Sequence, residues 1–254
     1  MIFDNHMHTI FSSDSTMKIE EVLEESKKQN LGIVLTEHLD LDFPDPDMFR
    51  LDVQNYFKTY ESYRCPTLGL GIEIGMNSDF LQEYTRVVNS NNFDFVIGSV
   101  HSIDGHDMAL DFFKVGSDKH ALYLKYFETM EKDVKDFDCF DALGHIDYPC
   151  RYAPYEDKEI HLEVYKEYID RIFIELLNKG KILELNTRTI ADKKRYASLH
   201  KIYTRYKELG GKYVTLGSDA HGKTAIGINF KIAHEFVDSI GLKEVHFENR
   251  IMKI

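Results

Sequence analysis

Six of the twelve histidines stand where a short apolar run of sequence ends, and three carboxylates stand beside them. In chain order these residues are His6, His8, Asp14, His38, Glu73, His101, His145, Asp219 and His221. Imidazole and carboxylate groups bind divalent transition metals, and a set without a thiolate points to Zn, Fe or Mn. Because one ion takes four to six ligands, nine are too many for a single metal. We therefore predict two to three divalent metal ions that share a carboxylate.

The evidence for a metal site is that histidines recur at the ends of apolar runs along the whole chain. His6 and His8 are two residues apart, so on an extended strand their side chains point to the same face. Any one histidine alone could be an ordinary core or surface residue. The other six histidines fall in predicted loops or helices, and we expect no ligand role for them; they are His106, His120, His161, His200, His234 and His246.

Short β-branched runs alternate with longer amphipathic segments, which is typical of repeated βα units around a parallel sheet. The seven predicted strands are Ile2–His8, Gly32–His38, Thr67–Ile74, Phe93–His101, Phe140–Ile146, Lys181–Asn186 and Lys212–Asp219. The predicted helices are Met17–Gln29, Asp118–Phe137, Ile160–Lys179 and Ala197–Leu209, the last two ending before Gly180 and Gly210. Since the loops that follow parallel strands meet at one edge of a sheet, the candidate ligands should converge there. With 254 residues, we expect one domain over residues 1–254.

Composition narrows the classes of partner. A net charge of −12 argues against general nucleic-acid binding, although bound divalent ions would still allow a small anionic substrate. The N-terminus lacks the features of a secretory signal, and no apolar run is long enough to span a bilayer. The three cysteines are widely spaced, which suits reduced thiols, and we expect Cys150 to be a buried filler rather than a nucleophile. We therefore expect a cytoplasmic protein without a membrane partner.

The candidate ligands, in their order from His6 to His221, resemble those of the polymerase and histidinol phosphatase family, the PHP domain. The resemblance implies an α/β fold, a distorted (β/α)7 TIM-like barrel with the metal site at the C-terminal ends of the strands. It also implies three groups of ligands: His6, His8, Glu73 and Asp219; Glu73, His101 and His145; and Asp14, His38 and His221. Asp14 stands where many members have histidine, which adds negative charge to the site.

Two arginines follow predicted strands and are our candidates for catalytic residues. Arg151 lies six residues after His145, in a stretch that resembles the histidinol phosphatase subgroup, where an arginine helps to hold the phosphate. Arg188 ends the one strand that offers no metal ligand. The stretch from Ser102 to Gly105 also resembles that subgroup, but the aromatic residue that follows it in some members is missing.

The resemblance implies a metal-dependent phosphomonoesterase with a small phosphorylated substrate, and within that class hydrolysis of L-histidinol phosphate in histidine biosynthesis. The cationic end of histidinol would need an acidic wall, for which the loops offer Asp104, Asp107, Glu156 and Asp157. Three alternatives remain open: a PHP phosphoesterase for nucleotides, oligonucleotide ends or phosphotyrosine; a non-catalytic metal-binding PHP module; and a metal-dependent amidohydrolase. The amidohydrolase pattern would need a bridging lysine where this chain has Glu73, and non-catalytic modules often lose ligands that this chain keeps.

Overall fold

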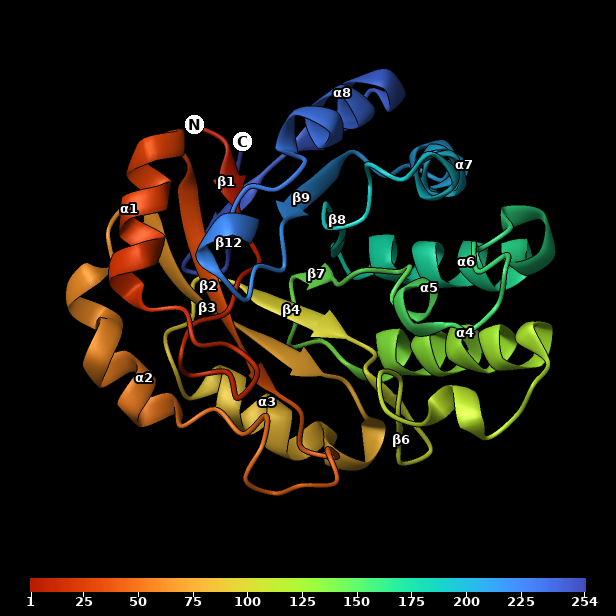
Figure 1. Cartoon of the computed structure of the whole chain (residues 1–254), viewed down its shortest axis with the longest axis horizontal. Coiled ribbons are helices and arrows are strands. Elements are labelled where there is room, and N and C mark those ends of the chain that lie inside the picture. The colour runs from red at the N-terminus through yellow and green to blue at the C-terminus, as the bar shows by residue number, and fades with distance from the viewer.

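The centre of the molecule is a parallel sheet that curls into a barrel, described over residues 1–254 by a computed structural model (Figure 1). Its strands follow the order β1-β2-β3-β4-β7-β8-β9-β10, and every neighbouring pair is parallel. Their bounds are Phe3–Asp4, Gly32–Leu39, Leu68–Gly75, Val96–Ser99, Ala142–Leu143, Ile182–Asn186, Tyr213–Gly217 and Lys243–Glu244. Because all of these strands run in one direction, their carboxyl ends lie at the same edge.

The first segment of the chain closes the barrel by lying between β2 and β9. The backbone N–H of Asn5 donates to the Leu216 carbonyl at 2.8 Å, and that of Asp219 donates to the His6 carbonyl at 2.8 Å. On the other side, the Thr36 N–H donates to the Met7 carbonyl at 2.9 Å. The segment that follows β1 is therefore held between two strands as far as the candidate ligands.

This architecture is the distorted TIM-like barrel that the sequence predicts, and each of the seven predicted strands overlaps one strand of the sheet. An eighth strand, β10, was not predicted, because its two polar residues carry no strand pattern. β10 pairs only with Tyr213 and Val214, the first residues of β9. It therefore lies at the edge opposite the candidate ligands and plays no part in positioning them.

Helices surround the strands, from α1 and α2 on one side to α4, α6 and α7 on the other (Figure 1). Their bounds, from α1 to α4 and then from α6 to α8, are Ile19–Gln29, Val53–Tyr60, Leu81–Asn89, Lys119–Asp136, Leu162–Asn178, Lys193–Glu208 and Phe230–Ile240. The four predicted helices are confirmed, whereas α2, α3 and α8 were not predicted. As predicted, Gly180 and Gly210 adopt positive φ angles, 68° and 110°, just beyond α6 and α7.

Helix α7 begins at Lys193, earlier than the predicted start at Ala197. The reason is the side chain of Asp192, which caps the helix by accepting hydrogen bonds from the backbone N–H groups of Lys194, at 2.8 Å, and Arg195, at 3.0 Å. Arg195 therefore belongs to the first turn of this helix.

The three segments that follow β2, β4 and β7 are mostly loops with short elements of their own. The second contains the antiparallel strands β5 (Ser102–Ile103) and β6 (His106–Asp107), and the third contains the single-turn helix α5 (Pro149–Tyr152). The remaining short elements are the 3₁₀ turns η1 to η4, at Glu61–Tyr63, Ser78–Phe80, Phe112–Lys114 and Lys223–Ala225, and the strands β11 (His246–Glu248) and β12 (Ile251–Lys253).

The interior of the barrel changes from apolar to polar towards the carboxyl ends of the strands. Residues two apart on a strand share a face, and on β2 the inward face reads Val34, Thr36 and His38. Val34 belongs to a separate cluster of 8 buried residues at the end of the barrel opposite the candidate ligands, which we call the lower end. There the rings of Phe95 and Phe247 stack 5.0 Å apart. The apolar lower end excludes water and leaves the opposite end to the polar side chains.

Candidate metal centre

The nine candidate ligands meet at the carboxyl ends of the strands, as the sequence predicts. A pocket of about 220 Å³ opens there, lined by Asp14, His38, Glu73, His101, His145, Tyr148, Arg151, Tyr152, Arg188, Asp219 and His221. His6 and His8 are fully buried beneath it, with their Nε2 atoms 3.1 and 3.5 Å from Glu73 Oε2. The nine candidate ligands, although far apart in the chain, thus form one continuous site.

Glu73 occupies the middle of this site, and its two carboxylate oxygens face different histidines. Oε1 lies 3.0 Å from His145 Nε2 and 3.2 Å from His101 Nε2. Oε2 lies 3.1 Å from both His6 Nε2 and His38 Nδ1. One carboxylate therefore stands between two sets of imidazoles, which is the arrangement a metal-bridging ligand needs.

Two contacts in this cluster fit bound metals better than a purely hydrogen-bonded network. The Nε2 atoms of His6 and His8 lie 3.1 Å apart, so they face each other with at most one proton between them. His38 Nδ1 lies 3.1 Å from Glu73 Oε2, yet it is buried without a hydrogen-bond partner. Buried polar atoms usually have a partner, and lone pairs that converge in this way suit a shared cation. The nitrogen and oxygen donors present therefore fit divalent transition metals.

The positions of the ligand atoms can be compared with the three groups that the family resemblance implies. Four sets of three ligand atoms lie within 4.8 Å of one another, and these are His6, His8 and Glu73; His38, Glu73 and His101; His6, His145 and Asp219; and His8, His38 and His221. The first set belongs to the first implied group, whereas the other three sets mix residues from different groups. Asp14 Oδ2 lies 2.9 Å from His221 Nε2 and 3.8 Å from His38 Nε2, in agreement with the third implied group.

Four of the six histidines are oriented by a hydrogen bond at Nδ1, which leaves Nε2 directed into the site. The partners of His6 and His101 are carboxylates, Glu184 at 2.5 Å and Asp40 at 2.7 Å. The His8 ring contacts the Ser12 hydroxyl at 3.1 Å, and that of His221 contacts the Asp219 carbonyl at 2.9 Å. Such contacts set both the tautomer and the ring orientation of metal-binding histidines.

These orienting side chains were not predicted from the sequence. Glu184 has a detectable signal, because it is a carboxylate inside the otherwise apolar run Ile182–Leu185 of a buried strand. Its second oxygen accepts a hydrogen bond from the backbone N–H of His145 at 2.8 Å. Asp40 also has a signal, since it follows His38 at the two-residue spacing of one strand face. Ser12 and Ser99, which donates to Glu73 at 2.6 Å, have no comparable signal.

Two glycines allow this packing. A Cβ atom added to Gly217 would overlap the carboxylate of Glu184 and the Cβ of His6, and one added to Gly144 would overlap the Ser99 hydroxyl. Any larger residue at either position would push aside a group that contacts a candidate ligand. Both positions therefore require glycine for the close packing around the candidate ligands.

The charge environment of His8, His38 and Asp219 suits metal binding. Burial, followed by the neighbouring His221 ring, lowers the pKa of His8 to about 4, and burial with the nearby His8 lowers the pKa of His38 to about 3. A neutral imidazole keeps the lone pair that binds a metal. Burial by itself would raise the pKa of Asp219, but Arg151 and His6 hold it well below the usual value. The carboxylate is therefore ionised and the two imidazoles are neutral at pH 7.

The two candidate arginines reach the same carboxylate from different loops. Arg151, in α5, has a side chain that is 8% exposed, and its Nη1 lies 2.5 Å from Asp219 Oδ2. Arg188, just beyond β8, is 49% exposed, and its Nη1 lies 4.0 Å from the same oxygen. Both line the pocket, so Arg151 forms part of its wall and Arg188 part of its rim.

The remaining six histidines and the three cysteines are not part of this cluster. None of the other six histidines belongs to a set of potential metal ligands. Cys150 is fully buried, and burial raises the pKa of its thiol to about 12. Cys139 is also buried with a raised pKa, whereas Cys65 is exposed and a hydrogen bond with Thr67 lowers its pKa.

We expect iodoacetamide at pH 8 to alkylate Cys65 in the native protein and to leave Cys139 and Cys150 unmodified, because the thiolate is the reactive species. Peptide mass spectrometry before and after denaturation gives the measurement, since all three thiols should react in urea. Rapid modification of Cys150 in the folded protein would contradict this assignment and reopen its role as a nucleophile.

Comparison with known proteins agrees with the geometry. The sequence model of the PHP domain matches residues 4–188, a span that ends before Asp219 and His221. A probable histidinol-phosphatase of Clostridium acetobutylicum is 42% identical, with 100% of this chain and 99% of the relative covered. The histidinol-phosphatase of Lactococcus lactis is 31% identical, with 95% and 92% covered.

A solved structure extends the similarity to three dimensions. The crystal structure of the Lactococcus lactis histidinol phosphate phosphatase, in complex with zinc, L-histidinol and phosphate, matches with a TM-score of 0.91 at 29% identity, covering 100% of this chain and 99% of that one. No helix of the present structure is both long and apolar enough to cross a membrane. With a domain match over most of its length and full-length relatives of this kind, the chain belongs to the PHP domain family.

Proposed function

We propose that this protein is a metal-dependent phosphatase that hydrolyses L-histidinol phosphate to L-histidinol and phosphate in histidine biosynthesis. The observation that carries the proposal is one pocket that is lined by seven of the nine candidate ligands, has His6 and His8 directly beneath it, and has a buried arginine in its wall. The histidinol-phosphatase relatives at 42% and 31% identity support the same reaction. We also propose that residues 1–254 act as one PHP domain, which the single barrel supports.

The site would hold two to three divalent ions, with zinc supported by the Lactococcus lactis structure. The proposed ligands are His6, His8, Asp14, His38, Glu73, His101, His145, Asp219 and His221. When bound, such ions supply Lewis-acid polarisation of the phosphoryl oxygens. The chain contributes the rest, with Glu73 between the two sets of imidazoles and Glu184 and Asp40 holding His6 and His101 in place.

Arg151 is the proposed binder of the phosphate. Its Nη1 is engaged by Asp219, whereas its Nε is buried without a hydrogen-bond partner. A guanidinium offers five N–H donors, so donors remain for phosphate oxygens after the contact with Asp219. Arg188, half exposed at the rim, would supply a second positive charge to the same anion. Negative charge that develops on the phosphoryl group would thus meet fixed positive groups.

A second pocket, of about 190 Å³, continues from the first and fits the leaving group. It shares Asp14, His38, His101, Tyr148 and Tyr152 with the metal pocket. Its own lining combines the apolar side chains of Phe43, Met48, Phe49 and Leu110 with the carboxylates of Asp42 and Asp107. Flat aromatic walls beside carboxylates suit a cationic compound with an imidazole ring.

Of the four acidic residues proposed from the sequence for this wall, only Asp107 lines the second pocket. Asp104 is at the surface in an ion pair with Lys125, and Glu156 and Asp157 border a different pocket. Asp42, which was not predicted, is the better-placed carboxylate. Its contacts with Asn77 and Ser102 both go to Oδ2, whereas Asp107 Oδ1 caps its own turn by accepting from Ala109 and Leu110.

The decisive experiment assays metal-loaded protein on histidinol phosphate, a nucleoside monophosphate, phosphotyrosine, a phosphodiester and an amide. We expect kcat/KM to be highest for histidinol phosphate and activity to vanish after chelation. A preference for the nucleotide, phosphotyrosine or amide would replace this proposal, and inactivity on all substrates would favour a non-catalytic module.

The Asp42→Asn variant tests the second pocket. It should raise KM for histidinol phosphate about tenfold and leave p-nitrophenyl phosphate hydrolysis unchanged, because only histidinol phosphate places a cation beside Asp42.

A further inference from the structure

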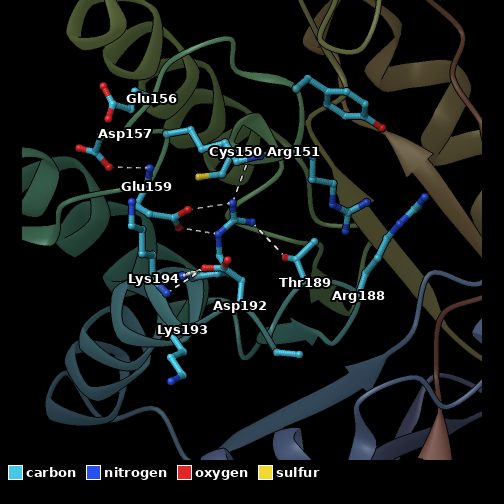
Figure 2. A pocket seen from close by; sticks show the side chains of 14 residues that line it. Cys150, Arg151, Glu156, Asp157, Glu159, Arg188, Thr189, Asp192, Lys193 and Lys194 are labelled. Carbon is cyan, nitrogen blue, oxygen red and sulfur yellow. Dashed lines mark hydrogen bonds and ion pairs between the residues drawn. The ribbon is translucent and has the colours of Figure 1, made fainter.

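Arg195, in the first turn of α7, uses all of its hydrogen-bonding capacity inside the protein. Its side chain is 3% exposed, and each of its five N–H donors has an acceptor. Nε and Nη2 bind the two oxygens of Glu159 at 2.6 and 3.3 Å; Nη1 binds Asp147 at 2.7 Å and the Thr189 hydroxyl at 3.1 Å; and Nη2 also binds the Cys150 carbonyl at 3.2 Å. The dashed lines that end at Glu159, Cys150 and Thr189 in Figure 2 mark part of this network.

These acceptors belong to the two loops that carry the candidate phosphate-binding arginines. Asp147 and Glu159 lie near the two ends of the loop between β7 and α6, and the Cys150 carbonyl immediately precedes Arg151. Thr189 immediately follows Arg188, in the loop after β8. Figure 2 shows the pocket that Glu156 and Asp157 border, with Arg151 and Arg188 at one side of it near Thr189. A single guanidinium thus contacts both loops from which these arginines project.

The charges make this connection rigid. Asp147 and Glu159 are buried, so one cation stands between two carboxylates that are shielded from water. Burial by itself would lower the pKa of Arg195, but the charge of Asp147 and the hydrogen bond with Glu159 raise it, so the guanidinium stays charged. Removing one partner of such a buried network leaves unpaired charge and is strongly destabilising. Breaking a contact between Arg195 and either carboxylate would therefore leave a buried charge unpaired, which is costly.

We infer that Arg195 is a positioning residue, which holds Arg151 and Arg188 in the geometry that binds the phosphate without touching the substrate. This inference rests on the proposed function, because it assigns Arg151 and Arg188 to the phosphate. A lysine could not replace it, since an ammonium group has three donors at one point and cannot reach four separate residues. If the network served only stability, the effect of changing Arg195 on kcat/KM would be the same with and without Arg151 and Arg188.

The first test compares Arg195→Lys with Arg205→Lys, in metal-loaded protein. Arg205 is a matched control because it lies on the same helix and its guanidinium pairs with Asp170 and Glu208, away from both loops. We expect Arg195→Lys to lower kcat/KM for histidinol phosphate by 10- to 100-fold, the range seen when groups that orient a site are lost. Metal content should not change, and the control should stay within twofold. Unchanged kinetics in Arg195→Lys would overturn the inference.

The second test asks whether Arg195 acts through the two arginines. In an Arg151→Ala/Arg188→Ala background, the further change Arg195→Lys should cost less than threefold, because the residues that it positions are already gone. A loss as large as in the wild-type background would show a role independent of them. If Arg195→Lys does not fold, Thr189→Val removes one contact with little change in volume. It should cost a few-fold in kcat/KM, and that loss should vanish in Arg188→Ala.

Failure of the proposed function can be separated from failure of this inference by calorimetric titration of inorganic phosphate into metal-loaded protein. If the wild type binds phosphate but does not hydrolyse histidinol phosphate, the proposed substrate is wrong. The affinity of Arg195→Lys for phosphate then decides the inference alone. A dissociation constant at least tenfold weaker than that of Arg205→Lys supports it, and equal constants overturn it.

Discussion

Replacement of Glu73 by glutamine should remove more than one metal ion per chain and lower kcat/KM by about 10³ or more. Both carboxylate oxygens of Glu73 face imidazoles, His101 and His145 on one side and His6 and His38 on the other. An amide keeps only one oxygen, and its NH₂ group cannot bind a metal. Since Lewis-acid stabilisation is worth several kcal/mol, and about 4 kcal/mol corresponds to 10³ in rate, the kinetic loss should be of this size.

Elemental analysis after reconstitution gives the metal content, and steady-state kinetics on histidinol phosphate gives the rate. Glu61→Gln is a suitable control, because Glu61 lies at the surface in η1, before the strand that carries Glu73. Full metal occupancy in Glu73→Gln, with kcat/KM within tenfold of the wild type, would remove Glu73 from the bridging position.

Arg151→Ala should lower kcat/KM by about 10²–10³ with the metal content unchanged, the scale for losing one preorganised donor to transition-state charge. The guanidinium is buried beside Asp219 and retains an Nε donor without a partner. Arg151→Lys should recover only part of the loss, because an ammonium group cannot form two parallel hydrogen bonds with a phosphate.

The kinetic pattern distinguishes this role from simple substrate binding. We expect kcat to fall, because the contact strengthens as charge develops on the phosphoryl oxygens, and inhibition by inorganic phosphate to weaken. A kcat/KM for Arg151→Ala within threefold of the wild type would exclude this role. Arg188, which approaches the same Asp219 oxygen at 4.0 Å, would then be the arginine to test.

The convergence of the nine candidate ligands could be predicted from residue order because of a property of parallel barrels. Every strand ends at the same edge, so a residue at the end of one strand meets residues at the ends of the others, however far apart they are in the chain. The nine candidate ligands needed only their residue types and their positions after apolar runs. The same reasoning placed Arg151 and Arg188 at the pocket, where the structure has them.

Contacts that depend on the direction of a side chain could not be predicted in this way. Asp104 and Asp107 belong to one hairpin, yet only Asp107 faces the second pocket, because the turn directs Asp104 towards Lys125. Glu184 and Asp40 are adjacent to the ligands only once the strands have closed around the barrel axis. Local sequence patterns record which residues share a face, whereas the partner across the barrel depends on register and curvature.

Arg195 shows this difference most clearly. In the sequence it stands among Lys193, Lys194 and Tyr196, which is typical of the solvent-exposed start of a helix. The structure buries it because Asp192 starts α7 early and turns the side chain of Arg195 towards Asp147 and Glu159, which are 48 and 36 residues away in the chain. The candidate metal ligands follow from residue type and chain order, but the groups that position a site depend on long-range packing, which only the folded chain establishes.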